Sequence, residues 1–121
     1  MALVLVVDDN LDTYKPLRRI LQYMGHDVSH AANGVDALGQ ISARKPNLVL
    51  MDISMPDMDG LEVLRRMRSD PELAELPVVM YSALSDERRQ QEARDLGAID
   101  YLVKGSMGIG DLKSSINRHL H

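Results

Sequence analysis

Polar side chains follow four of the five short apolar runs in this sequence, each at the point where the run ends. Asp8 and Asp9 come after the first run, Asp52 ends the third, Ser82 follows the fourth and Lys104 follows the fifth. In an open parallel sheet, ligands bind beyond the carboxyl ends of the strands. We therefore expect these five side chains to meet at one edge of a sheet.

The three carboxylates of this set predict a cation site. Carboxylates gathered at one place repel one another, so their cluster needs a cation or a raised pKa. The ligands are all oxygen, with no His or Cys close by in sequence, which favours Mg²⁺, with Mn²⁺ as a substitute, over zinc. Lys104 adds a positive charge, and Ser82 can donate a hydrogen bond. A divalent ion and an ammonium group around a carboxylate suit phosphoryl transfer.

The elements that must position these residues alternate along the chain. Segments with helical spacing, such as residues 17–24, 61–67 and 109–120, separate the apolar runs. Several runs are almost continuously Val, Leu, Ile and Met, which is typical of strands covered on both faces of a parallel sheet. The pattern predicts five strands and five helices, an α/β fold with helices on both faces. The predicted strands are Leu3–Val7, Val28–Ala32, Leu48–Met51, Val78–Tyr81 and Tyr101–Val103.

Helix-ending and helix-starting residues stand at the expected places. Gly25 and Gly97 are placed to end the first and fourth helices, and Pro46 ends the second. Ser85, followed by two acidic residues, predicts the N-cap of the fourth helix. Pro16 falls early in the first helix and could kink it.

Length and composition exclude several classes of protein. The chain has 121 residues, which indicates one domain over 1–121, and its net charge of −4 argues against a nucleic-acid-binding module. It has no Cys, so disulfides and thiol chemistry are excluded. The apolar run Ala2–Val7 is too short to span a bilayer, and it lacks the basic region of a signal peptide. We expect no membrane association and a cytoplasmic location.

Four segments together resemble the receiver domains of bacterial two-component signalling. They are the acidic pair after the first strand and the segments 50–60, 79–83 and 97–104. The resemblance covers essentially the whole chain. It implies a flavodoxin-like (βα)5 fold with strand order 2-1-3-4-5.

The resemblance also implies a metal site and a phosphoacceptor. Asp52 matches the residue that accepts a phosphoryl group from a kinase histidine in this family. Asp9 matches a direct Mg²⁺ ligand and Asp8 a ligand that acts through water. The backbone carbonyl of Ser54 would complete the protein's share of the metal shell.

A switch and a set of partners follow from the same resemblance. Ser82 and Lys104 would bind the phosphoryl oxygens, and Tyr101 matches the family's aromatic switch residue. The partners would be a sensor histidine kinase or a histidine phosphotransfer protein, with a downstream effector that the sequence does not identify. The face built from the fourth helix, the fifth strand and the fifth helix would change shape on phosphorylation. Such a domain is a signalling switch and not an enzyme in the ordinary sense.

Two positions depart from the family pattern. Gly105 stands where most receivers have a proline in a cis peptide bond. Because a cis bond costs about 2.5–4 kcal/mol without proline, we expect the Lys104–Gly105 bond to be trans. Ile99 replaces an aspartate that is frequent in receivers that dimerise as winged-helix transcription factors. We therefore expect a monomer or a weak dimer.

Three other functions compete with this interpretation. An Asp-nucleophile phosphatase of the dehalogenase-like superfamily would have Asp-x-Asp-x-Thr after the first strand and a cap insertion, but Asn10 stands two residues after Asp8. A dinucleotide or flavin module would need a glycine-rich turn after the first strand, which residues 8–11 lack. A degenerate receiver that only binds proteins is the remaining alternative, although all five site positions hold competent residues.

Overall fold

Strands and helices alternate along the whole described chain, as the apolar pattern predicts. The computed structural model describes residues 2–83, 86–104 and 108–120. The strands are β1 (Leu3–Val7), β2 (Asp27–Ala31), β3 (Leu48–Asp52), β4 (Val78–Ser82) and β5 (Asp100–Val103). The helices are α1 (Leu11–Tyr23), α2 (Gly34–Ala43), α3 (Gly60–Ser69), α4 (Glu87–Asp95) and α5 (Ile109–His119).

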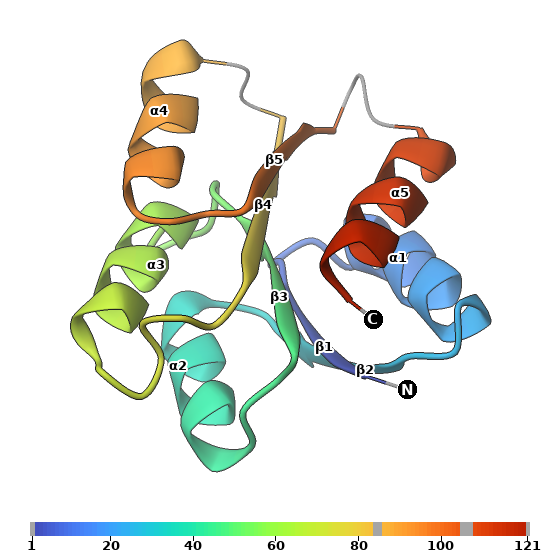
Figure 1. Cartoon of the computed structure of the whole chain (residues 1–121), viewed down its shortest axis with the longest axis horizontal. Helices are drawn as coiled ribbons and strands as arrows, with labels where there is room; N and C mark the ends of the chain where they lie inside the picture. The colour runs from blue at the N-terminus through green and yellow to red at the C-terminus, as the bar shows by residue number, and fades with distance from the viewer. Residues whose placement is uncertain (1, 84–85, 105–107, 121) are drawn as a thin grey trace.

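The five strands form one parallel sheet in the order β2-β1-β3-β4-β5. Helices α1 and α5 cover one face of this sheet, and α2, α3 and α4 cover the other (Figure 1). The predicted doubly wound fold and the predicted strand order are therefore confirmed. In this order the chain reverses direction across the sheet at β1 and β3, which places the ligand-binding edge at the ends of these two strands.

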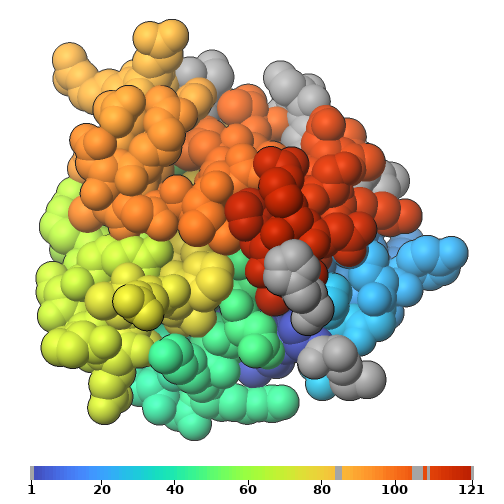
Figure 2. All heavy atoms as spheres, in the orientation of Figure 1, coloured from blue at the N-terminus to red at the C-terminus, as the bar shows by residue number. Residues whose placement is uncertain are grey.

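Alternate residues of the central strands enter two separate hydrophobic clusters. Val4 and Val6 of β1 face α1 and α5, whereas Leu5 and Val7 face the other three helices. Strands β1, β3 and β4 have five residues each, and all of these residues are buried. Burial on both faces explains why these strands are almost continuously apolar in sequence. In the space-filling view, helices cover the sheet so that little of β1 is visible (Figure 2).

Glycines end two of the helices, as predicted. Gly25 has φ +91° after α1, and Gly97 has φ +82° after α4. Each glycine N–H donates to a carbonyl of the last helical turn, and the next residue donates to a carbonyl one position earlier. This pattern of two bonds is the Schellman motif, and its positive φ favours glycine.

The start of α4 differs from the prediction. The N-cap is Asp86, whose side chain accepts a hydrogen bond from the backbone N–H of Arg88. The predicted cap, Ser85, lies outside the described residues. Both residue types are good caps, so the sequence alone placed the helix start one residue too early.

In α1, Asn10 caps the helix and Pro16 lies inside it, so the helix continues past the proline.

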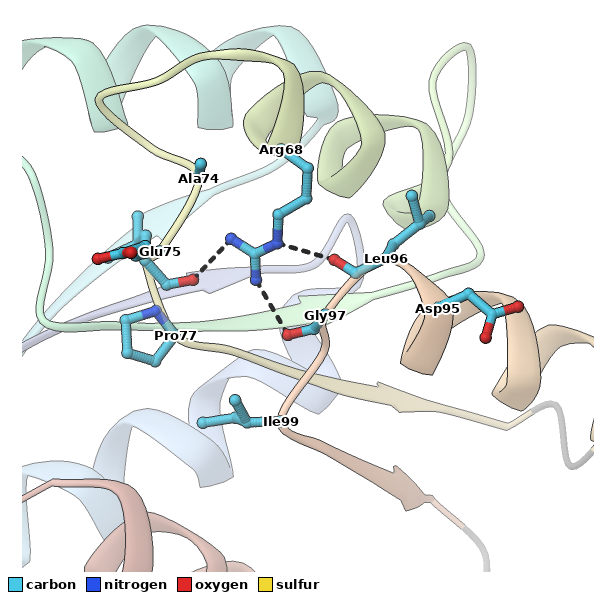
Figure 3. A pocket seen from close by; sticks show the side chains of 9 residues that line it. Arg68, Ala74, Glu75, Pro77, Asp95, Leu96, Gly97 and Ile99 are labelled. Carbon is cyan, nitrogen blue, oxygen red and sulfur yellow. Dashed lines mark hydrogen bonds between the residues drawn. The ribbon is translucent and has the colours of Figure 1, made fainter.

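The Arg68 side chain ties together three segments at the end of the sheet opposite the predicted site. Its guanidinium donates to the backbone carbonyls of Leu96 and Gly97 after α4 (Figure 3). It also donates to the carbonyls of Leu73 and Leu76, in the loop between α3 and β4. Burial lowers the pKa of Arg68 from its usual value. Arg68 therefore holds the end of α4 against the end of α3.

Two further expectations from the sequence concern membrane association and the Lys104–Gly105 peptide bond. No helix within the described residues combines the length and the apolar composition that crossing a bilayer requires. The expected trans bond between Lys104 and Gly105 lies outside the described residues, because residues 105–107 are not described. It stays a prediction.

Candidate functional site

The ends of β1 and β3 bring the three predicted carboxylates together. Asp8 is fully buried, Asp52 is 3% exposed, and Asp9 is exposed beside them. One carboxylate oxygen from each of the three lies within 4.8 Å of the others. The predicted acidic cluster therefore exists at the carboxyl edge of the sheet.

Asp52 is the last residue of β3 and has a cation on one side. The Lys104 Nζ lies 3.2 Å from its Oδ2 atom. The backbone N–H of Ser54 donates to its Oδ1 atom at 3.3 Å. Burial raises the pKa of Asp52 above its usual value; the charge of Lys104 opposes this rise, and the charge of Asp8 adds to it. A buried carboxylate with a raised pKa beside a lysine is a typical feature of a reactive site.

Asp8 has partners for both of its carboxylate oxygens. Its Oδ1 atom accepts a hydrogen bond from the backbone N–H of Asn10 at 2.9 Å. Its Oδ2 atom accepts one from the Tyr81 hydroxyl at 2.7 Å and lies 3.6 Å from the Lys104 Nζ. A buried charge needs such partners, because an unpaired one would be very costly. Asp8 is therefore held in one orientation.

Lys104 follows β5 and reaches back across the edge of the sheet. Its backbone N–H donates to the carbonyl of Ser82 at 2.8 Å, which extends the pairing of β5 with β4. Its Nζ contacts both Asp52 and Asp8, and it lies 4.9 Å from the centre of the Tyr81 ring. The strand fixes the base of this side chain, and the two carboxylates direct its end.

Tyr81 is a residue of the site that the sequence analysis missed. In sequence it is part of the apolar run of β4 and of the segment 79–83 and has no predicted role, yet its hydroxyl contacts Asp8. Burial, and then the charge of Asp8, raise the pKa of Tyr81 far above its usual value. Strand periodicity could have found it. Residues 79 and 81 face the same side of the sheet as residues 50 and 52, and Tyr81 pairs in register with Asp52.

Ser82 and Tyr101 lie together on the opposite side of the sheet. Ser82 is fully buried at the end of β4, and Tyr101 packs against the cluster beneath α2, α3 and α4. Burial raises the pKa of Tyr101, and a hydrogen bond with the Ser82 side chain lowers it. The two residues predicted to form the switch are therefore joined in this structure.

The loop between β3 and α3 passes directly over the end of β3. Ser54 is exposed in this loop, and Asp57 has φ +68°, a left-handed conformation that aspartate tolerates better than most residues. Gly60 follows the loop, and its N–H donates to the carbonyl of Ile53 at 2.9 Å. A Cβ atom at Gly60 would lie 2.2 Å from the carbonyl oxygen of Asp52, so only glycine fits there.

The donor set fits a hard divalent cation. The three clustered side chains offer only carboxylate oxygens, and Asp9 is exposed and so open to an ion from solvent. Mg²⁺ prefers such ligands and keeps several of its waters. The side chains present are therefore compatible with the Mg²⁺ that the sequence predicts.

Sequence comparisons show which known proteins this chain is similar to. Residues 4–117 match the family described as the response regulator receiver domain. A gliding motility regulatory protein of Myxococcus xanthus is 34% identical over 115 residues, which are 95% of this chain and 15% of that protein. The response regulator MprA of Mycobacterium sp. strain KMS is 40% identical over 101 residues, 84% of this chain and 43% of MprA. The chain thus spans less than half the length of these relatives.

Solved structures share the whole architecture. The chemotaxis protein CheY4 of Vibrio cholerae is 29% identical, with a TM-score of 0.91 over 99% of both chains. The signal receiver domain of a histidine kinase from Syntrophus aciditrophicus is 31% identical, with a TM-score of 0.90 over 99% of this chain and 90% of that one. Since the family match spans the sheet and most of α5, this chain belongs to the response regulator receiver domains of two-component signalling.

Proposed function

We propose that Asp52 is the phosphoacceptor of this receiver domain. A carboxylate oxygen of Asp52 attacks the phosphorus of a phosphohistidine on a sensor kinase or a histidine phosphotransfer protein. An O–P bond forms while the N–P bond breaks, and the imidazole nitrogen keeps the electron pair of the broken bond. The products are an acyl phosphate on Asp52 and a free histidine on the partner.

The observation that carries this proposal is the position of Lys104. Its ammonium lies 3.2 Å from the Asp52 carboxylate and comes from a different strand. A fixed positive charge at this place neutralises the oxygens of an incoming phosphoryl group without needing to reorganise. The Ser82 hydroxyl, at the end of the neighbouring strand, would bind another of these oxygens.

The three carboxylates would share one Mg²⁺ ion. Asp9 and Asp52 would bind it directly, Asp8 would act through a water, and the carbonyl of Ser54 would complete the protein's ligands; Mn²⁺ could replace Mg²⁺. When bound, the ion neutralises negative charge on the carboxylates and on the phosphoryl oxygens. Without such a cation, the charges of Asp8 and Asp9 repel an incoming phosphoryl group.

Phosphorylation would then change the surface near Tyr101. Drawing Ser82 toward the phosphoryl group breaks its hydrogen bond with Tyr101 and lets the ring move. The surface of α4, β5 and α5 would shift between two populations, because the phosphoryl group favours one of them. We propose this face as the one that meets the downstream effector.

Location, oligomeric state and nucleic-acid binding complete the proposal. We propose a cytoplasmic switch that is a monomer or a weak dimer, without direct nucleic-acid binding by this domain. The alternative of a degenerate receiver that only binds proteins is disfavoured, because competent residues fill all the site positions. The three carboxylates lie within 4.8 Å of one another, and Lys104 contacts Asp52.

Intact-mass spectrometry tests the proposal. With Mg²⁺ and acetyl phosphate as a small donor, the chain should gain one phosphoryl group. Asp52→Asn should gain none, whereas Asp57→Asn, which alters an exposed aspartate in the loop that follows β3, should gain one. Equal labelling of Asp52→Asn and the unmodified chain would place the acceptor elsewhere.

A further inference from the structure

Tyr81 is a buried polar residue that the proposed phosphotransfer does not use. It is 1% exposed, and its hydroxyl donates to the Asp8 Oδ2 atom at 2.7 Å. A buried tyrosine hydroxyl normally finds a partner, but a neutral carbonyl would serve equally well. Here the partner is a fully buried carboxylate of the site.

The Asp8 oxygen that accepts this hydrogen bond is also within reach of Lys104. The Lys104 Nζ lies 3.6 Å from this atom and 3.2 Å from the Asp52 Oδ2. The ammonium thus lies between two carboxylates that compete for it. A hydrogen bond to Asp8 reduces its attraction for Lys104, so the ammonium is left closer to Asp52.

The Tyr81 ring adds a second constraint on Lys104. The Nζ atom lies 4.9 Å from the ring centre, within the range of a cation–π contact. A tyrosine hydroxyl has an ordinary pKa of about 10 and so carries its proton at neutral pH, whereas an ionised carboxylate can only accept a hydrogen bond. Tyr81 can therefore act only as a donor to Asp8.

We propose that Tyr81 is a positioning residue of this site: its hydroxyl holds Asp8 and leaves the Lys104 ammonium directed at Asp52. The effect on phosphorylation rests on the proposed function of Asp52. The effect on Asp8 and on cation binding does not, since it depends only on the hydrogen bond.

Tyr81→Phe should change metal binding and phosphorylation in opposite directions. Removing the hydroxyl leaves Asp8 with more uncompensated negative charge, so Mg²⁺ should bind roughly three- to tenfold more tightly in a calorimetric titration. Asp8 should also attract Lys104 more strongly. Phosphorylation by acetyl phosphate at saturating Mg²⁺ should therefore slow by a similar factor. A simple loss of structure would weaken both, so the opposite signs distinguish positioning from folding.

Two controls isolate the hydrogen bond. Tyr14→Phe removes the same hydroxyl from another buried tyrosine on the same side of the sheet, one that stacks on His30 and contacts no carboxylate among the described residues. It should leave Mg²⁺ affinity unchanged. In an Asp8→Asn background the charge is absent, so adding Tyr81→Phe should change Mg²⁺ affinity less than twofold.

Unchanged or weaker Mg²⁺ binding by folded Tyr81→Phe overturns the proposal, as does an unchanged phosphorylation rate. If Tyr81→Phe does not fold, NMR of the unmodified chain decides: a Tyr81 hydroxyl proton that is protected from exchange and shifts on adding Mg²⁺ supports the role, and fast exchange overturns it. If the unmodified chain takes no phosphoryl group, the proposed function fails, and the Mg²⁺ comparison still decides whether Tyr81 acts on Asp8.

Discussion

Asp52 carries its negative charge in surroundings that favour the neutral acid. Its pKa is raised mainly by burial. Because the folded state then holds the proton more tightly than the unfolded state, ionising Asp52 lowers stability as the pH rises from the unfolded value through the raised folded value. Above that window Asp52 is ionised in both the folded and the unfolded state, and its destabilising contribution has reached its full size.

A thermal unfolding series over pH tests this sign. Without Mg²⁺ at pH 7, Asp52→Asn should melt at a higher temperature than the unmodified chain. The difference should shrink as the pH falls toward about 4, where Asp52 regains its proton in both states. Glu75→Gln, which removes an exposed carboxylate, should show no such pH-dependent difference. A lower melting temperature for Asp52→Asn at pH 7 would contradict the account.

The acidic pair should divide its roles between direct and indirect binding of Mg²⁺. Asp9→Ala removes a proposed direct ligand and should abolish measurable Mg²⁺ binding. Asp8→Ala removes a proposed water-mediated partner and should weaken binding by about tenfold. Calorimetric titration of both variants compares the losses, and equal losses would show that the two roles are wrongly assigned.

Residue identities in the site were largely predictable, and their contacts were not. Asp8, Asp52 and Lys104 stand at strand ends, and topology alone brings such positions together. The role of Tyr81 depends on which side of the sheet its ring lies and on a hydroxyl reaching a charge two strands away. An apolar run does not show either of these, although strand periodicity limits the choice to one face.

Among the elements, α3 is held against the end of β3 by Gly60. A Cβ there would meet the backbone of Asp52, which cannot move aside easily. Gly60→Ala should therefore destabilise the fold by about 1–3 kcal/mol. Gly39, inside α2, has nothing within 4 Å of its Cβ position, so Gly39→Ala should stabilise by about 0.5–1 kcal/mol.

Urea denaturation of the two glycine variants measures this difference. Stabilisation by both substitutions would show that the contact between α3 and β3 is not tight.

The same two glycines illustrate what the sequence can predict about helices and strands. All five strands were placed within one residue by their apolar runs, but the two helical glycines look alike until the structure shows what surrounds each.

Over the whole molecule, the proposed phosphorylation site and the proposed switch residues lie on opposite faces of the sheet. Asp8, Asp52 and Lys104 meet at the edge beside α1 and α5, whereas the pair Ser82 and Tyr101 lies beneath α4. A signal from Asp52 must therefore cross the sheet to reach α4. Arg68 holds the far end of α4 through the carbonyls that follow it, so we expect a change in α4 to be largest at its start.

Amide NMR with beryllofluoride, a phosphoryl mimic, tests this path. Addition with Mg²⁺ should shift Ser82, Tyr101 and the first turn of α4 around Arg88 and Arg89. Residues 96–98 should shift less, because Arg68 holds them. Shifts confined to the loop at residues 53–59 would contradict a switch that crosses the sheet.

The most direct test of the central claim is to locate the phosphoryl group. The chain is phosphorylated by a phosphohistidine donor with Mg²⁺, the acyl phosphate is trapped by borohydride reduction, and tandem mass spectrometry identifies the modified residue. The account predicts modification at Asp52 alone and its loss when a chelator removes Mg²⁺. Modification at another residue, or equal modification without Mg²⁺, would contradict it.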